Sequence, residues 1–232
     1  MDTCIPVVTA LVFRIQAEYD ALNQVLEQQA EEEAQDDDMP ILQDNRAMSR
    51  VFVVSEMLTI AMYCDYGDEM GRQKMYMLVR EMLGNAWLPA ELVPRCLDVL
   101  LRLSSGHRDF LQMVVELVQS LDEDMVDPDA SVRQALSWRQ RVHADNPEMT
   151  PERAANKAAL EARRLLIVQS MLERIACSLQ DDTSLEGLIQ ELIVPTIQSR
   201  DVALREQGIV CLGLCSILDG KAALVTLSLI HI

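Results

Sequence analysis

The sequence predicts an all-α protein of stacked helix hairpins. Half of the 232 residues are hydrophobic but only 4% are aromatic, and glycine and proline number 8 each, a composition typical of helical chains. Apolar residues recur with the helical period of 3.6, and no periodic segment fits the strand period of 2. From position 68 to position 107 is 39 residues, close to the roughly 40 of a HEAT or armadillo repeat. We therefore expect an α-solenoid of HEAT-like hairpins with about ten helices.

The first half of the chain holds five expected helices, separated by turn signals. The first is amphipathic and runs into the acidic stretch EEEAQDDD. The second ends before Asp65 and Gly67, the third is stopped by Gly84, Pro89 opens the fourth, and Gly106 separates it from the fifth. These helices cover about 7–34, 47–64, 68–83, 89–104 and 107–121.

The second half holds five more expected helices. A short one lies within an irregular stretch, and Thr150 with Pro151 then forms the N-cap and first turn of a long helix. Thr183 and Glu186 fit a capping box. Asp219 and Gly220 break the helix of the last complete hairpin. These helices cover about 130–143, 151–179, 183–199, 201–218 and 221–229.

The same signals predict three regions. Residues 1–121 form HEAT-like hairpins, with an acidic, solvated linker at about 31–44. Residues 122–150 form an irregular linker with a short helix. Residues 151–232 form further hairpins.

A local pattern recurs at the start of hairpin helices. Asp68 precedes Arg72 and Asp201 precedes Arg205 by four positions, and a looser copy joins Asp129 to Arg133. Each aspartate is placed to cap free N–H groups, with the arginine one turn later on the same face. Each single copy also fits a plain exposed ion pair, but stacked repeats place equivalent caps in a row, and we interpret the pattern as caps and a ladder of that kind.

Cys211 and Cys215 lie four positions apart in DVALREQGIVCLGLCSIL and raise the question of a metal or redox site. A zinc site needs further close pairs of Cys or His, which the remaining cysteines and histidines do not form, and redox pairs read C-x-x-C. In a helix the two thiols share a side with Val210, Leu214 and Leu218, so we expect buried structural thiols. Six scattered cysteines indicate a reducing compartment.

Charge is segregated along the chain. The formal net charge of −17 argues against a free-standing nucleic-acid binder. Residues 131–175, however, hold eight Arg or Lys against five Asp or Glu. Arg153, Lys157, Arg163 and Arg164 are the candidate contacts for DNA phosphates or an acidic protein segment. The alternative is a solvated helix face, because Glu152 and Glu161 are interleaved with them.

Nothing in the sequence predicts catalysis. It contains no Gly-rich phosphate loop, no G-x-S-x-G and no H-E-x-x-H, and we expect His107 and His143 to be surface residues. We expect no enzyme activity, cofactor or metal. No apolar run reaches the roughly 18 residues of a membrane span, and the start lacks a basic signal-peptide region, so we expect a soluble protein without membrane contact. The methionines Met70, Met75, Met77 and Met82 have the helical spacing of core residues.

Two blocks of the sequence resemble a known family. CDYGDEMGRQKMYMLVREML, LPAELVPRCLDVLLRLS and FLQMVVELVQSL are similar to the middle of the condensin HEAT-repeat subunit of the CAP-G kind, one of the non-SMC subunits of condensin. LIVPTIQSRDVALREQGIVCLGLCSILDGKAAL is similar to the start of that family's C-terminal conserved region. The blocks cover residues 62–121 and 188–224 in the family's order. Because family members are much longer, the resemblance implies an interior fragment. The final TLSLIHI does not match the family.

The resemblance implies a non-catalytic scaffold of the condensin complex in mitotic chromosome condensation. It implies binding to the kleisin subunit, association with the SMC ATPase subunits through the complex, and DNA contact that is weak outside the complex. It also implies a location in the nucleus and on chromosomes, with a cytoplasmic pool. The alternative is a generic HEAT or armadillo adaptor in transport or phosphatase assembly, whose repeats need not reproduce the two blocks in order.

Overall fold

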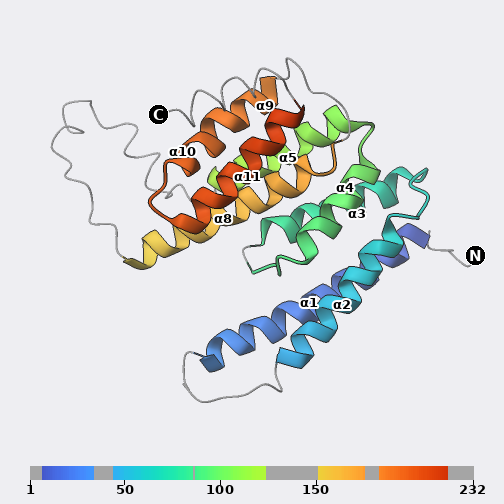
Figure 1. Cartoon of the computed structure of the whole chain (residues 1–232). Coiled ribbons are helices and arrows are strands. Elements are labelled where there is room, and N and C mark those ends of the chain that lie inside the picture. Colours follow the sequence, from blue (N-terminus) through green and yellow to red (C-terminus); the bar gives the residue numbers. More distant parts are fainter. Residues whose placement is uncertain (1–6, 34–43, 86, 124–150, 176–182, 219–232) are drawn as a thin grey trace, which may run out of the picture. The chain divides into compact units, whose positions relative to one another are not determined.

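The computed structural model describes residues 7–33, 44–85, 87–123, 151–175 and 183–218. Within these ranges the chain is helical and contains no strand (Figure 1). The all-α prediction is confirmed. Eight of the ten expected helices lie in the described residues, and the one expected over 183–199 is observed as three consecutive segments. The observed elements are α1 (Val7–Glu33), α2 (Asp44–Ala61), α3 (Glu69–Gly84), α4 (Leu92–Leu103), α5 (His107–Glu123), α8 (Pro151–Leu172), α9 (Thr183–Leu188), the π-helical segment η1 (Ile189–Ile193), α10 (Val194–Ile197) and α11 (Val202–Leu218).

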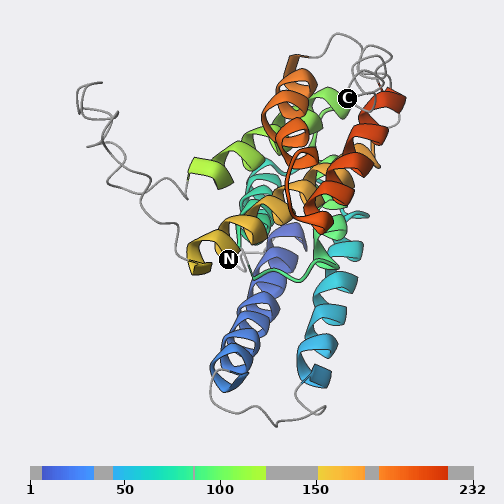
Figure 2. The same ribbon diagram turned by 60° about the vertical axis from the view of Figure 1, so that its left-hand side comes forward.

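The first of two compact units spans Met1–Phe110 and contains two stacked hairpins. α1 lies against both α2 and α3, and α4 lies against both α2 and α3. Helices α1 and α2 run side by side in both views (Figures 1 and 2). Their apolar stripes are buried, as the helical period requires. The buried residues include Ile15, Tyr19 and Leu22 of α1, Val54 and Leu58 of α2, Met75 and Met82 of α3, and Val93 and Leu97 of α4.

The second unit spans Leu111–Ile232, and within it α11 packs along α8. α11 also contacts α10 and η1. The buried residues at these helices include Leu165, Val168 and Met171 of α8, Leu192 and Ile193 of η1, and Leu204 and Leu212 of α11. α5 begins in the first unit and continues into the second. The predicted division at residues 122–150 stays a prediction, because 124–150 lie outside the described residues.

Several expected boundaries differ from the observed ones. α2 begins and ends about one turn earlier than expected. It ends early because Tyr63 and Cys64 donate their N–H groups to the carbonyls of Ile60 and Ala61, three residues back, which closes the helix with a tight turn. α8 ends at Leu172 in a similar turn. The helices expected at about 130–143 and 221–229, and the core of the acidic linker at 34–43, lie outside the described residues.

The helix expected over 183–199 is interrupted by a π-helical turn. The N–H of Val194 donates to the carbonyl of Ile189, five residues back. Pro195 follows and has no N–H with which to continue the α-helical ladder. A widened turn before it accommodates the missing bond. The helix expected over 183–199 is therefore continuous as far as Ile197, but it changes from α to π geometry over Ile189–Ile193.

Two glycines allow close contact between helices. A Cβ atom at Gly71 of α3 would lie 3.1 Å from Cβ of Val8 in α1. A Cβ atom at Gly208 of α11 would lie 3.2 Å from Cγ1 of Ile197 and 3.4 Å from its backbone nitrogen. Gly213 of α11, by contrast, has no such neighbour within 4 Å. At the first two positions glycine therefore allows close packing, and an added methyl group would need the neighbouring side chain to shift.

We predict opposite effects for alanine at the two glycines of α11. Gly208→Ala should lower the free energy of unfolding by about 1–3 kcal/mol, because the added methyl group overpacks the contact with Ile197. Gly213→Ala should raise it by about 0.5–1 kcal/mol through helix propensity alone. Urea denaturation of both variants measures the difference, and stabilisation by Gly208→Ala would contradict the packing argument.

Candidate functional site

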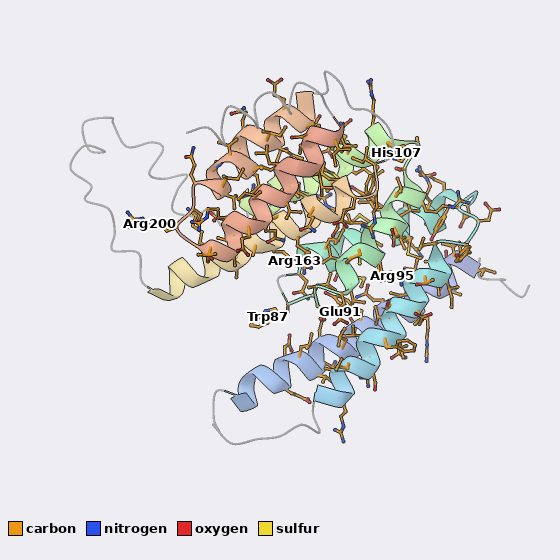
Figure 3. All side chains as sticks on the ribbon, viewed as in Figure 1. Trp87, Glu91, Arg95, His107, Arg163 and Arg200 are labelled. Carbon is orange, nitrogen blue, oxygen red and sulfur yellow. The ribbon has the colours of Figure 1, made fainter. Side chains whose placement is uncertain are left out.

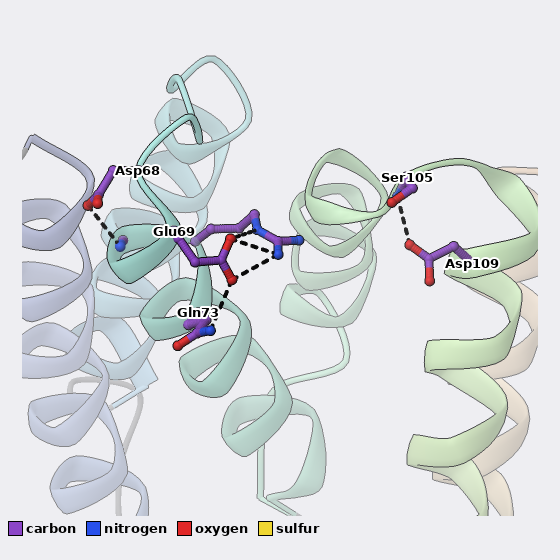
Figure 4. A network of polar contacts seen from close by, with 7 residues as sticks. Asp68, Glu69, Gln73, Ser105 and Asp109 are labelled. Atoms are coloured by element: carbon purple, nitrogen blue, oxygen red, sulfur yellow. Dashed lines mark hydrogen bonds and ion pairs between the residues drawn. The ribbon is translucent and has the colours of Figure 1, made fainter.

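Asp68 caps α3. Its Oδ2 accepts a hydrogen bond from the backbone N–H of Gly71 at 3.0 Å (Figure 4). Arg72 does not turn back to Asp68: its Nε and Nη2 both donate to the carboxylate of Glu69 at 2.9 Å. Glu69 also accepts from Gln73 at 2.9 Å. Asp68 therefore caps the backbone of α3, whereas Arg72 forms a separate ion pair with Glu69 at the surface.

Asp201 occupies the equivalent place before α11. Its Oδ1 accepts from the N–H of Ala203 at 2.9 Å and more weakly from that of Leu204 at 3.4 Å. Arg205 reaches back to the carbonyl of Ser199 at 3.4 Å, so it contacts the preceding loop. The two aspartates thus play the same role while the two arginines have different partners. The looser copy, Asp129 to Arg133, lies outside the described residues.

The basic set of α8 does not form one uniform face. Lys157 is exposed and pairs with Glu161, with 3.8 Å between Nζ and Oε1. Arg163, labelled in Figure 3, and Arg164 are half-buried. Nε and Nη2 of Arg163 and Nε of Arg164 are covered by protein. The side chain of Arg153 lies outside the described residues. Lys157 is therefore the accessible cation of this set among the three described side chains.

A second basic surface, which was not predicted from the sequence, lies on α2. Arg46 and Arg50 are one turn apart and, with Ser49 and Val25 of α1, line an open hollow of about 650 Å³. Arg50 pairs with Glu18 of α1 at 3.2 Å. The spacing of four residues between the two arginines is the signal that could have indicated this surface, because it places both on one side of a helix.

Asn85 connects the turn after α3 to α1. Its Nδ2 donates to Oη of Tyr19 at 2.7 Å and to Oδ1 of Asn23 at 3.4 Å, while its Oδ1 accepts from the backbone N–H of Trp87 at 2.9 Å. Burial raises the pKa of Tyr19 above its ordinary value, although the bond to Asn85 opposes this effect. Trp87, labelled in Figure 3, is 69% exposed. It follows Asn85, whose hydrogen bond to Tyr19 links this turn to α1.

Cys211 and Cys215 are buried thiols, as the structural interpretation predicted. The thiol of Cys211 contacts the carbonyl of Leu165 in α8 at 3.8 Å. Burial raises the pKa of Cys211 from 9.0 to about 12, with a smaller contribution from the negative charge of Glu173. A thiol held neutral in this way is a poor metal ligand and a poor nucleophile.

The predicted stripe around these thiols was partly wrong. Val210 is 48% exposed and Leu214 is half-buried, whereas Leu218 is buried as expected. The buried side also carries Leu204, Gly208 and Leu212. The buried side of α11 thus includes Cys211 together with Gly208 and Leu212, and not with Val210 and Leu214 as predicted. The spacing of two cysteines alone does not distinguish between the two sides.

His107, expected at the surface, is half-buried and so lies only partly there. Its Nδ1 is covered by protein and has no hydrogen-bond partner among the described residues. His143 lies outside the described residues.

Within the part of the chain that the structure describes, no three His, Cys, Asp or Glu side chains gather as metal ligands. None of the described helices is both long and apolar enough to cross a membrane. Met70 and Met77 are exposed, while Met75 and Met82 are core residues.

Comparison with known proteins points to one group. Residues 163–231 match the family model described as "Nuclear condensing complex subunits, C-term domain". The chain is similar to condensin complex subunit 3. It is 24% identical to that subunit of Schizosaccharomyces pombe over 196 residues and 22% identical to that of Saccharomyces cerevisiae over 222 residues. The aligned regions cover 74% and 75% of this chain.

A solved structure shows the same fold. The chain superimposes with a TM-score of 0.65 and 23% identity on a chain in the crystal structure of the S. pombe condensin Cnd3–Cnd2 subcomplex, and 94% of this chain is covered. The matched region is 24% of that chain, and 22% and 21% of the two curated relatives. This chain thus spans about a quarter or less of the relatives that it matches, which fits the expected interior fragment.

We predict that the observed face of α11 controls its contribution to stability. Leu212→Ala should lower the free energy of unfolding by about 2–5 kcal/mol, because Leu212 is buried. Val210→Ala, on the exposed side, should change it by less than about 0.5 kcal/mol. Chemical denaturation of the two variants tests this, and equal losses would show that the assigned face is wrong.

Alkaline pH should weaken the fold through Cys211. The folded thiol has the higher pKa, so its stabilising effect is complete below about pH 9 and is lost as pH rises toward about 12. Cys211→Ala should therefore show a smaller loss of unfolding free energy over this range than the natural chain. Denaturation curves at a series of pH values measure the difference. Parallel curves would mean that the thiol ionises equally in both states.

Proposed function

We propose that this chain is a solenoid segment of a condensin subunit of the subunit 3 kind, acting as a non-catalytic scaffold. The observation that carries the proposal is the match of residues 163–231 to the C-terminal domain model of nuclear condensing complex subunits. The two curated relatives, both condensin complex subunit 3, support it over about three quarters of the chain. A generic adaptor would share the hairpin fold but has no such support.

The proposed partner is the kleisin subunit of the complex. The solved relative is a subcomplex of Cnd3 with a second subunit, Cnd2, and this pairing supports a kleisin-type partner for the present chain. Helix hairpins stacked in series provide an extended surface for such a ligand. Contact with the SMC ATPase subunits would arise through the complex. The corresponding place of action is the nucleus and its chromosomes, with a cytoplasmic pool.

DNA contact is proposed only within the larger complex. The net charge of −17 repels phosphates at long range, and the excess in residues 131–175 is eight minus five, or +3. The half-buried state of Arg163 and Arg164 limits how far they reach toward a ligand. Lys157, whose side chain is exposed, is the described member of the basic set that is best suited to contact DNA or an acidic kleisin segment, and Arg153 stays a candidate from the sequence. Asp68, Arg72, Asp201 and Arg205 are proposed to support the stacked helices and not to bind ligand.

A pull-down from extract tests the kleisin assignment. The tagged chain should retain the kleisin above the level of a bead control, but less of it than the full-length subunit, because a segment offers only part of the groove. The Asp201→Asn variant serves as a matched control, because asparagine also accepts hydrogen bonds at a helix N-cap. It should retain the same amount of kleisin as the natural chain. No retention by the segment beside clear retention by the full-length subunit would refute kleisin binding by this chain.

DNA titrations test the basic set. We expect the isolated chain to bind labelled duplex DNA only weakly at about 0.15 M salt. In a complex rebuilt with the kleisin, Arg153→Glu with Lys157→Glu should weaken DNA retention, and the loss should shrink as salt rises. Adding Arg163→Gln and Arg164→Gln tests the half-buried pair without burying a new negative charge. Unchanged affinity would assign the set to a solvated face, and submicromolar binding by the chain alone would overturn the expectation.

A further inference from the structure

Helix α2 is apolar on two opposite sides. Its inner side faces α1 and α4 and buries Ala47, Val51, Val54, Leu58 and Ala61. Its opposite side exposes large apolar side chains that share one face at 3.6 residues per turn. We name these residues, with the turn that follows the helix, the outer face of α2: Met48, Phe52, Val53, Glu56, Ile60 and Tyr63. Their apolar members are between 41% and 83% exposed.

An exposed apolar face of this kind is a candidate interaction site. Large exposed apolar side chains gather along one side of α2, and exposed apolar patches on soluble proteins mark sites of protein interaction. The outer face belongs to one helix and follows its ridge, as Met48, Phe52, Glu56 and Ile60 recur every fourth residue. Such a ridge fits into the groove of another helix. It is poorly suited to nucleic acid, because it carries no cation.

Glu56 indicates what the partner helix carries. It stands near the middle of the outer face, is exposed, and makes no hydrogen bond or ion pair within the described residues. If a second copy of this chain docked through the same face, the two-fold axis would bring two Glu56 carboxylates together, which is unfavourable. A lysine or arginine opposite Glu56 would neutralise it as the surrounding face is covered. The charge thus favours a different helix over a second copy.

The relatives that this chain matches are much longer, and we infer the origin of that helix from their length. The matched region is less than a quarter of the solved chain and of the curated subunits, so most of the solenoid in those proteins lies outside it. In the first unit, the α3–α4 hairpin already covers the inner side of the α1–α2 hairpin. A further hairpin on the outer face would continue the same stacking in the opposite direction.

We propose that the outer face of α2 is a docking surface for an amphipathic helix with a basic residue opposite Glu56, supplied by a further hairpin of the longer solenoid. The source of the helix rests on the proposed function, whereas the recognition of an apolar helix with a central cation rests on the face alone.

Binding of two synthetic peptides tests the proposal. Both are fluorescein-labelled helical peptides of about 20 residues with leucine at every third or fourth position, and they differ in one central residue, lysine or glutamate. In fluorescence anisotropy titrations, the 232-residue chain should bind the lysine peptide at least about tenfold more tightly than the glutamate peptide. The difference should shrink as salt rises, and Glu56→Lys should reverse the preference.

Matched variants locate the binding. Phe52→Glu with Ile60→Glu should weaken binding of the lysine peptide at least about tenfold while leaving the melting temperature nearly unchanged, because both side chains are exposed. Met70→Glu with Met77→Glu is the control, since these residues are equally exposed on α3. It should leave the affinity within about twofold.

Three results would overturn the proposal. The first is no binding of either peptide by the natural chain at about 100 µM. The second is an equal loss in the two double variants. The third is concentration-dependent dimerisation of the natural chain that Phe52→Glu with Ile60→Glu abolishes, which would assign the face to a second copy. The kleisin pull-down does not depend on these peptides, so failure of the proposed function and failure of the docking surface are distinguishable.

Discussion

Close approach between helices at the beginning of α3 and along α11 is the constraint on which the hairpin packing depends. At Gly71 the backbone of α3 comes near Val8 of α1, and at Gly208 that of α11 comes near Ile197. An added Cβ atom at either position would need its neighbour to shift by a few tenths of an ångström. The aspartate caps work together with these contacts. Asp68 and Asp201 satisfy N–H groups of the first turns, so those turns can pack closely without leaving backbone donors unpaired.

The polar groups of this protein support packing more than chemistry. Cys211 is neutral and enclosed against α8, and Asn85 uses its amide to fasten a turn to Tyr19 and Asn23. The exposed surfaces are of two kinds. One is basic, on the exposed part of α8 and at the start of α2, where Lys157 and Arg50 form ion pairs with neighbouring glutamates. The other is the apolar outer face of α2.

Much of the fold could be predicted because helices are specified locally. The helices α1, α3, α5 and α11 begin and end within about two residues of expectation, since caps and glycines act over one turn. The interruption before Pro195 was missed because the surrounding pattern reads as one continuous amphipathic helix. The candidate site could be predicted only in part. Arg72 has both Asp68 and Glu69 within reach on the helix surface, and spacing alone does not decide between two such carboxylates.

The sequence by itself determined the helical class, the aspartate caps and the burial of the two thiols, because helical period, hydrogen-bonding capacity and hydrophobicity are properties of neighbouring residues. The tertiary structure alone decided which side of α11 is buried, how far Arg163 and Arg164 are covered, and that α2 exposes a second apolar side. A side chain's environment depends on which other helix lies against it. That contact joins residues far apart in the chain, and no local pattern records it.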